Sequence, residues 1–197
     1  MRPRIEGRYF DDLYRAEHDP WRFESSPYER AKYEASLAAL EGRRFGRALE
    51  VGCSIGVFTE LLAPSCDELW AIDISPVALE RARPRLLGAN HVHLEQRSMP
   101  EDMPPGPFDL IVCSEVLYYW SRELVLEGLE RFEAALAAGG SLLAVHWRLA
   151  TNYPLQGDDV HDLLARHTTL VQALSRRAPE YRLDRFDKQG GAGQGSP

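Results

Sequence analysis

The sequence lacks an excess of basic residues, a long apolar run and a segment typical of a signal peptide. Its 197 residues carry 23 Lys and Arg against 30 Asp and Glu, a formal net charge of -7. Nucleic-acid-binding domains usually present a basic face, so this balance argues against a nucleic-acid partner. The start, MRPRIEGRYFDDLYR, has no apolar core, and no stretch approaches the length of a membrane span. We therefore expect a cytoplasmic protein without a nucleic-acid or membrane partner.

Cysteine is also scarce, and its three residues do not form a metal-ligand pattern. Cys53, Cys66 and Cys113 lack the short spacing of zinc ligands and leave an odd thiol. A reducing compartment is the simplest setting for such a chain, and no metal is expected. The length suits one well-buried domain, and no internal repeat is visible.

Residues 1–46 are predicted to form an N-terminal helical cap. Ser26 and Pro27 supply a capping hydroxyl and a proline at the first helical position, and Glu29 is spaced to complete a capping box. Beyond the cap, apolar strand patterns alternate with helical ones. Strands are expected at 47–52, 69–74, 92–97, 108–115 and 141–147. Helices are expected at 57–63, 76–83 and 158–167, with a long helix after 120 that runs past Leu136 and ends at Gly139 and Gly140.

Alternation of strands and helices predicts parallel pairing with right-handed crossovers and helices on both faces of the sheet. The last two apolar runs, 169–176 and 181–187, are joined by Ala178 and Pro179 without a helix, so they predict an antiparallel hairpin. The expected fold is α/β, a seven-stranded Rossmann-like sheet that is mostly parallel. Its core spans 47–188, and the glycine-rich end, 189–197, is predicted to be disordered.

A glycine turn follows the first expected strand, in the segment LEVGCSIGVFTELL. Gly52 and Gly56 let the backbone pass close to a ligand. A dinucleotide site would favour glycine at the positions of Ser54 and Val57, so a diphosphate ligand is disfavoured. Glu50 also disfavours a diphosphate ligand, because a carboxylate repels phosphate and suits a cationic, amine-bearing ligand.

Asp73 ends the second expected strand, about 20 residues beyond the glycine turn, where an acid accepts hydrogen bonds from ribose hydroxyls. Turn and acid together indicate a ligand with a ribose and a cationic amino-acid part but no diphosphate. S-adenosylmethionine meets each condition.

Several segments in order along the chain carry a family resemblance. EVGCSIG at 50–56, AIDIS at 71–75 and FDLIVCSEVLYY at 108–119 resemble class I S-adenosylmethionine-dependent methyltransferases. DPWRFESSPYERAKYE at 19–34, SEVLYYW at 114–120, and HWR with YPLQGDDVHDLL at 146–148 and 153–164 resemble the NodS-type family. The resemblance covers roughly residues 8–188. NodS enzymes N-methylate an amino sugar at the end of a chitooligosaccharide, so the resemblance implies methylation of an amine on a sugar or sugar-containing small molecule, with S-adenosylhomocysteine as product.

The resemblance also implies a cofactor site, residue by residue. Trp21 is expected to close the pocket or to hold the cap against the core. The expected contacts to the methionine, ribose and adenine parts of the cofactor are Glu50, Gly52, Cys53, Gly56, Asp73, Ile74, Ser98, Met99 and Ser114. Many class I members have glycine at position 54 and an acid at position 98 for the adenine amino group. Serine at both places leaves the fold prediction intact and puts that adenine contact in doubt.

The acceptor side of the site is expected after the fourth and fifth strands. Glu115 could bind an ammonium, orient an amine or hydroxyl, accept a proton, or merely cap the turn that follows it. His146 suits a base and equally suits a buried structural histidine. Predicted substrate contacts are Tyr118, Tyr119, Trp147 and Arg148. His161 is more simply a surface histidine of a helix.

Other functions remain compatible with these residues. An O-methyltransferase is the main alternative, because nothing visible separates amine from hydroxyl acceptors. A non-catalytic homologue that only binds the cofactor, and a nicotinamide-dependent reductase, are distinguished by calorimetry with S-adenosylhomocysteine and by thermal stabilisation with NAD. No Asn-Pro-Pro-Tyr motif follows the fourth strand, so DNA and protein glutamine are poor substrates. No oligomeric state is predicted.

Overall fold

The computed structural model describes residues 4–190. Its strands are β1 (Phe45–Val51), β2 (Cys66–Asp73), β3 (Val92–Gln96), β4 (Phe108–Ser114), β5 (Leu136–Trp147), β6 (Val171–Arg177) and β7 (Tyr181–Asp187). Its helices are α1 (Gly7–Ala16), α2 (Pro27–Ala38), α3 (Val57–Leu62), α4 (Pro76–Arg85), α5 (Arg122–Ala135) and α6 (Gly157–His167), with the short 3-10 turns η1 (Ala63–Ser65) and η2 (Leu117–Tyr119).

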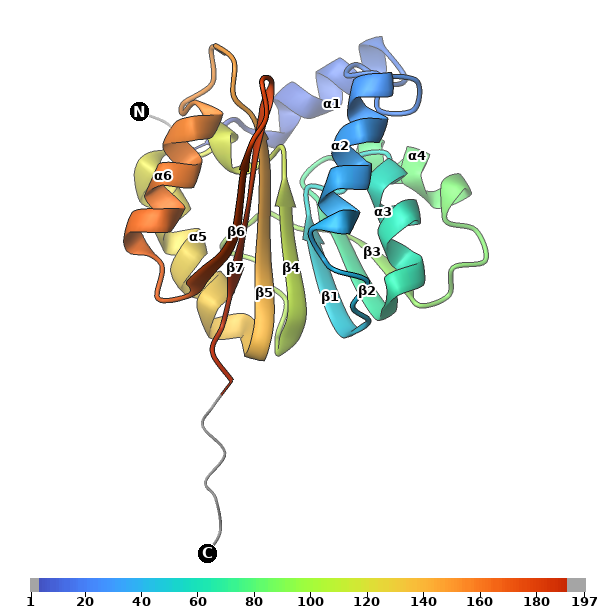
Figure 1. Cartoon of the computed structure of the whole chain (residues 1–197). Helices are drawn as coiled ribbons and strands as arrows, with labels where there is room; N and C mark the ends of the chain where they lie inside the picture. The colour runs from blue at the N-terminus through green and yellow to red at the C-terminus, as the bar shows by residue number, and fades with distance from the viewer. Residues whose placement is uncertain (1–3, 191–197) are drawn as a thin grey trace, which may run out of the picture.

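The seven strands form one sheet in the order β3-β2-β1-β4-β5-β7-β6. The first five pair in parallel, whereas β7 runs antiparallel to both β5 and β6. Helices α5 and α6 cover one face, and α2 and α3 cover the other (Figure 1). The predicted fold class, including the C-terminal antiparallel hairpin, is confirmed.

Helix α2 begins where its sequence predicts. The Ser26 hydroxyl accepts the Glu29 amide at 3.4 Å, and Pro27 occupies the first helical position, where its missing N–H costs nothing. The Glu29 side chain does not complete a capping box. It turns instead toward Lys32, 3.0 Å away, and so becomes part of the cavity described below.

The boundary between α5 and β5 was predicted wrongly. The helix ends at Ala135, and Leu136 has extended backbone and already pairs with Phe108 of β4. The register then shifts, so that Leu110 pairs with Ser141, and the intervening residues bulge out of the ladder. Gly139, with φ at +78°, takes a conformation that favours glycine within this bulge. The two glycines therefore serve a strand irregularity and do not end the helix.

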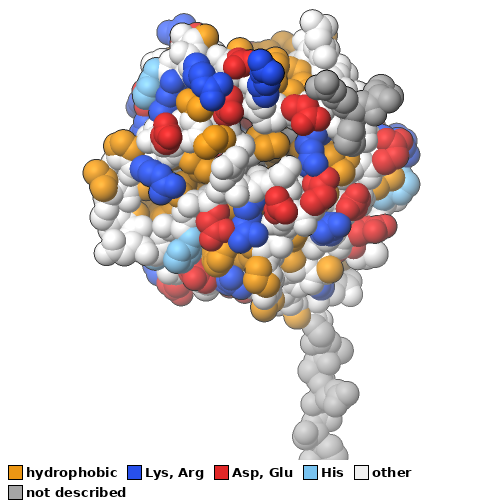
Figure 2. Space-filling model, turned by 180° about the vertical axis from the view of Figure 1, so that it is seen from behind, with side chains coloured by type: hydrophobic (Ala, Val, Ile, Leu, Met, Phe, Trp, Pro, Cys, Tyr) orange, Lys and Arg blue, Asp and Glu red, His pale blue; other side chains and the backbone are white. Residues whose placement is uncertain are grey.

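Strand β1 starts at Phe45, two residues before the predicted start of the core, and the predicted disorder falls largely on 191–197, outside the described residues. No helix within residues 4–190 has the length and apolar character needed to cross a membrane. On the face shown in Figure 2, acidic and basic side chains are interspersed.

Candidate functional site

A cavity of about 410 Å³ opens at the carboxyl ends of β1, β2, β4 and β5, beneath residues of the N-terminal cap. This is the edge of an open α/β sheet where ligands bind, and the volume is in the range of small-molecule sites. Twelve of the predicted site residues line it: Trp21, Glu50, Gly52, Cys53, Asp73, Ile74, Met99, Ser114, Glu115, Tyr118, Tyr119 and Trp147. Four do not: Gly56, Ser98, His146 and Arg148.

The turn after β1 is shaped by left-handed backbone. Gly52 has φ at +79°, and a Cβ there would lie 3.2 Å from Cβ of Val116, so a side chain would crowd the cavity floor. Ser54 also has positive φ, at +53°, and its hydroxyl lies 2.5 Å from the hydroxyl of Tyr14 on α1. The serine that departs from the usual glycine therefore ties the cap to the turn after β1.

Asp73 connects this turn to the start of α4. Its Oδ2 accepts the Ser54 amide and its Oδ1 accepts the Ser75 amide, both at 2.8 Å. Burial raises the pKa of Asp73 to about 6, against the opposing effect of these amide donors. Each oxygen keeps a further lone pair for a ligand hydroxyl.

Glu50 is the most exceptional acid of the cavity. Its side chain is buried, its Oε2 has no hydrogen-bond partner, and burial raises its pKa to about 7. A buried carboxylate oxygen without a partner is costly unless a cation or donor meets it. The cavity thus contains an acceptor suited to the ammonium group of an amino-acid ligand. Together with the open floor at Gly52 and the acid Asp73, this fits S-adenosylmethionine.

Glu115 also lines the cavity and comes directly after β4. Its backbone has φ at +55°, and its amide donates to the Val145 carbonyl at 2.8 Å. Its Oε2 accepts the Tyr118 hydroxyl at 2.6 Å and the Trp147 amide at 2.9 Å. Its Oε1 accepts Lys32 Nζ at 2.5 Å. Three donors from three elements hold this carboxylate in place.

Lys32 was missed by sequence reasoning. It comes from α2, its side chain is 1% exposed, and it lies between Glu115 and Glu29, 2.8 Å from Glu29 Oε2. Burial lowers the pKa of Lys32, but the two carboxylates outweigh burial and the net shift is upward. Burial raises the pKa of Glu29 despite the lysine. Two carboxylates and one ammonium leave this cluster with an excess of one negative charge when all are ionised.

Tyr28, also missed, adds a polar group to the same wall. Its ring packs edge-on against Trp147 at 5.4 Å between centroids, and its buried hydroxyl has no partner. The sequence does contain a signal for both residues, because Tyr28 and Lys32 are one helical turn apart on α2 and therefore share a face. Their approach to Glu115 depends on tertiary packing.

Gly56 and Ser98 lie outside the lining of the cavity and have local structural roles, and their cofactor contacts remain predictions. Gly56, with φ at +80°, precedes α3, and a Cβ there would lie 3.1 Å from Cβ of Ala82, so it permits close packing of α3 on α4. The Ser98 amide donates to Asp102 Oδ2 at 3.1 Å. Ser98 and Met99 were predicted to flank the adenine. Of these two residues, Met99 lines the cavity and Ser98 does not.

His146 does not face the cavity. Its side chain is fully buried, its Nε2 accepts the Leu117 amide at 3.1 Å, and its Nδ1 lies 3.1 Å from Nε2 of His161. Adjacent side chains of a strand point to opposite sides, so Trp147 takes the cavity side and His146 the α6 side. The structure therefore does not support His146 as a base. His161 is itself fully buried, contrary to the surface position expected for it.

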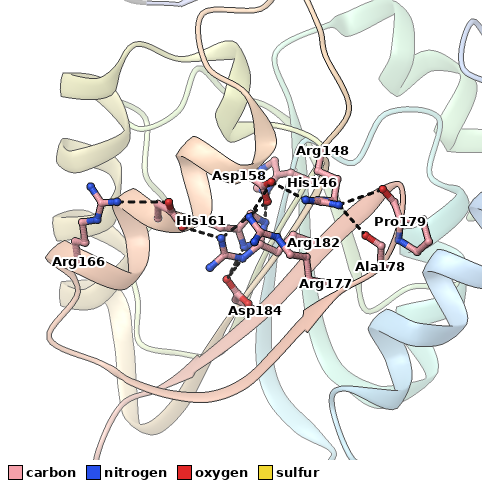
Figure 3. Close-up of polar contacts among 11 residues, drawn as sticks. His146, Arg148, Asp158, His161, Arg166, Arg177, Ala178, Pro179, Arg182 and Asp184 are labelled. Atoms are coloured by element: carbon pink, nitrogen blue, oxygen red, sulfur yellow. Dashed lines mark hydrogen bonds and ion pairs between the residues drawn. The ribbon is translucent and has the colours of Figure 1, made fainter.

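Arg148 is also directed away from the cavity. Its guanidinium pairs with Asp158 at 3.0 Å and donates to the carbonyls of Ala178 and Pro179 in the β6–β7 turn (Figure 3). These partners account for its charge within the fold. No cluster of three or more His, Cys, Asp or Glu suited to a metal ion occurs in residues 4–190.

The sheet order, the glycine turn after β1 and the acid at the end of β2 define the class I S-adenosylmethionine-dependent methyltransferase fold. Comparison with known proteins narrows this class. The family model described as Nodulation protein S (NodS) matches residues 11–149. The chain belongs to the NodS family.

Individual relatives agree with this membership. Nodulation protein S of Rhizobium tropici is 41% identical over 105 residues, which are 53% of this chain and 44% of the relative. The crystal structure of the N-methyltransferase NodS from Bradyrhizobium japonicum WM9, in complex with S-adenosylhomocysteine, superposes with a TM-score of 0.82 at 29% identity, covering 93% of this chain and 99% of that one. A ubiquinone biosynthesis O-methyltransferase of Xanthomonas campestris is 32% identical over 117 residues, 57% of this chain and 46% of the relative. The chain thus spans about half the length of the curated relatives it matches.

Proposed function

We propose that this protein transfers a methyl group from S-adenosylmethionine to an amine of a sugar or sugar-containing small molecule. The observation that carries the proposal is the likeness to the NodS N-methyltransferase over 93% of the chain, together with a cavity at the carboxyl ends of the strands of this sheet. Glu50, Gly52 and Asp73 are the proposed cofactor contacts of the turn, and Trp21, Cys53, Ile74, Met99 and Ser114 complete the lining.

The cofactor supplies an activated methyl group on a sulfonium, and the chain's own residues position what receives it. In-line displacement requires the acceptor nitrogen to face the methyl with its lone pair free. Glu115 has three donors already and one acceptor position left on Oε1, which suits an amine N–H. When both its carboxyls are ionised, the Glu29–Lys32–Glu115 cluster has an excess negative charge, which favours a cationic amine over an anionic acceptor. The Tyr28 hydroxyl, which has no partner, suits a sugar hydroxyl.

The test is methyl transfer measured by mass spectrometry. Chitooligosaccharides with a free terminal amine should gain mass in the presence of S-adenosylmethionine, and fully N-acetylated chains of equal length should not. Binding of S-adenosylhomocysteine is measured in parallel by calorimetry. Transfer to a phenolic hydroxyl but to no amine would favour O-methylation, the second candidate indicated by the O-methyltransferase relative. Absence of S-adenosylhomocysteine binding would overturn the cofactor assignment.

Glu50→Gln should separate stability from cofactor affinity. Because the ligand-free fold raises the Glu50 pKa from 4.5 to about 7, its stabilising contribution is full below about pH 4.5 and is lost as pH rises through about 7. The variant should lack this loss and, at pH 8, be at least as stable as the parent. Its dissociation constant for S-adenosylhomocysteine should rise about 30-fold, from the loss of roughly 2 kcal/mol of charged hydrogen bonding.

Urea unfolding between pH 4 and 8, and calorimetry at pH 8, measure the two effects. Glu60→Gln, at an exposed acid of α3 paired with Arg85, removes the same charge outside the cavity and is the matched control. Equal affinity in Glu50→Gln and the parent would remove Glu50 from the cofactor site.

A further inference from the structure

A chain of hydrogen bonds crosses the α5–α6 side of the sheet behind the cavity. The Leu117 amide donates to His146 Nε2 at 3.1 Å, His146 Nδ1 lies 3.1 Å from His161 Nε2, and His161 Nδ1 lies 2.8 Å from Asp184 Oδ2. The two histidines and the aspartate are fully buried. They belong to β5, α6 and β7, and Figure 3 shows them converging between the hairpin and α6.

The Leu117 amide sets the donor and acceptor of every hydrogen bond in this series. A backbone amide can only donate, so His146 Nε2 must accept, and a neutral His146 carries its hydrogen on Nδ1. That hydrogen is donated to His161 Nε2, and the hydrogen on His161 Nδ1 is donated to Asp184. Each ring has one permitted tautomer. Protonation of His146 would bring two donors face to face at Leu117.

The segment that this chain contacts carries the proposed acceptor contacts. Leu117 begins the 3-10 turn η2, where backbone amides lack partners within the turn. Glu115 precedes it with left-handed backbone, and Tyr118 within it donates to Glu115. Three consecutive residues of β5 bind this segment: Val145 through its carbonyl, His146 through its ring and Trp147 through its amide.

Ion pairs hold the Asp184 end of this series of hydrogen bonds. Asp184 Oδ2 also accepts Arg182 Nε at 3.0 Å, and Arg182 pairs with Asp162 of α6 at 2.8 Å. Asp158, at the start of α6, pairs with Arg148 and Arg177 (Figure 3). The histidines are therefore anchored to the C-terminal hairpin at one end and to the segment of Glu115 at the other.

We infer that His146, His161 and Asp184 form a positioning relay, which holds Leu117 and thereby fixes the Glu115 carboxylate and Tyr118 for the methyl acceptor. The inference rests on the proposed function for the role of Glu115, whereas the relay geometry stands apart from it. These are positioning residues, because none of the three lines the cavity.

The relay is tested first by long-range proton–nitrogen NMR of the imidazole rings in the full chain. Between pH 5.5 and 8 both rings should stay neutral, each with its hydrogen on Nδ1. The charged and titratable groups around them are Tyr118 and Lys32 near His146, and Asp184, Arg182 and Asp158 near His161. Burial first, and then the neighbouring His161, lowers the His146 pKa well below its ordinary value, in agreement with a neutral ring. Hydrogen on Nε2 of His146, or titration of its ring in this range, would overturn the relay.

Kinetics of variants test the positioning. His146→Leu removes the acceptor for Leu117 and should lower kcat about tenfold, since small displacements of a reacting pair are costly. His146→Gln retains an acceptor near the position of Nε2 and should recover most of that loss. Both should keep the dissociation constant for S-adenosylhomocysteine within about twofold, because the cofactor contacts lie on other strands. His93→Leu is the control, because this half-exposed histidine of β3 pairs with Glu68 outside the relay, and the variant should keep the parental kcat.

Two results separate the possible failures. If Leu and Gln at position 146 reduce kcat equally, the side chain matters only for packing and the positioning role is wrong. If the parent methylates no acceptor, the proposed function fails. The Leu117 amide resonance then decides the relay, because it should move upfield in His146→Leu and remain in place in His146→Gln. If His146→Leu does not fold, His146→Gln and the parental tautomers still decide it.

Discussion

Lys32→Met should destabilise the protein by about 3–5 kcal/mol, the cost typical of removing one member of a buried ion pair. The lysine is 1% exposed and contacts both Glu29 and Glu115, so methionine would leave two carboxylates close together without a cation. For a chain of this size, the melting temperature should fall by roughly 10 °C. Urea unfolding at pH 7 measures the free energy directly. The deficit should shrink toward pH 4, where protonation of a carboxyl relieves the repulsion.

The chain supplies its own control for this change. Lys188 is the only other lysine, and its Nζ donates to the carbonyls of Glu133 and Leu136, both at 2.7 Å. Lys188→Met removes hydrogen bonds but uncovers no buried carboxylate, so its cost should be on the order of 1–2 kcal/mol. Adding Glu115→Gln to Lys32→Met should restore part of the stability, because only one buried charge then remains. A loss under about 1 kcal/mol for Lys32→Met, comparable to a surface pair, would contradict the cluster.

The fold was predictable because its signals are local. Strand and helix periods alternate along the chain, and Ala178–Pro179 joins two apolar runs without room for a helix. The error at Gly139 and Gly140 has an equally local origin. Glycines with positive φ end helices and also form strand bulges, and only the pairing of Leu136 with Phe108 shows which applies.

The place of Glu50 and Asp73 in one cavity was predictable because strand ends converge there. Glu50 and Asp73 lie at or near the ends of adjacent parallel strands, so their sequence positions alone bring them together. The same reasoning failed for His146, which shares a strand end with Trp147. The side chains of His146 and Trp147 leave the strand on opposite sides, and the strand pattern alone did not show which of the two would face the cavity.

The contact between the N-terminal cap and Glu115 could not be predicted from the order of the residues along the sequence. Lys32 bonds to Glu115 across 83 positions, and nothing near position 32 marks a partner at that distance. A lysine within the buried face of α2 was the available signal, since lysine is seldom fully buried without a counterion. The proposed boundary between a 1–46 cap and a 47–188 core therefore divides residues that are in direct contact.

Glu115→Gln should lower kcat for an amine acceptor about 100-fold, the lower limit of what a positioned proton acceptor contributes. Glutamine has nearly the same shape and can still accept the Trp147 amide, but it lacks the negative charge that attracts an acceptor ammonium and takes up its proton. Tyr118, which donates to this carboxylate at 2.6 Å, would keep its partner through the amide oxygen. The amide nitrogen cannot accept from Lys32, but Lys32 keeps Glu29 as its counterion, so the fold should be preserved at a cost in stability. The largest effect should appear in the methyl-transfer rate.

Glu29→Gln is the matched control, because it removes the same charge from the other side of Lys32. The Glu115 carboxylate is held by Lys32, Tyr118 and the Trp147 amide, whereas Glu29 has Lys32 alone, so Glu29 is less constrained to serve an acceptor. Its variant should lose only a few-fold in kcat. Single-turnover rates at saturating cofactor, with calorimetric affinity for S-adenosylhomocysteine held within about twofold, isolate the chemical step. Retention of more than half the parental rate in Glu115→Gln would show that the acceptor amine is positioned without this carboxylate, and equal losses in both variants would assign the effect to the charge of the cluster as a whole.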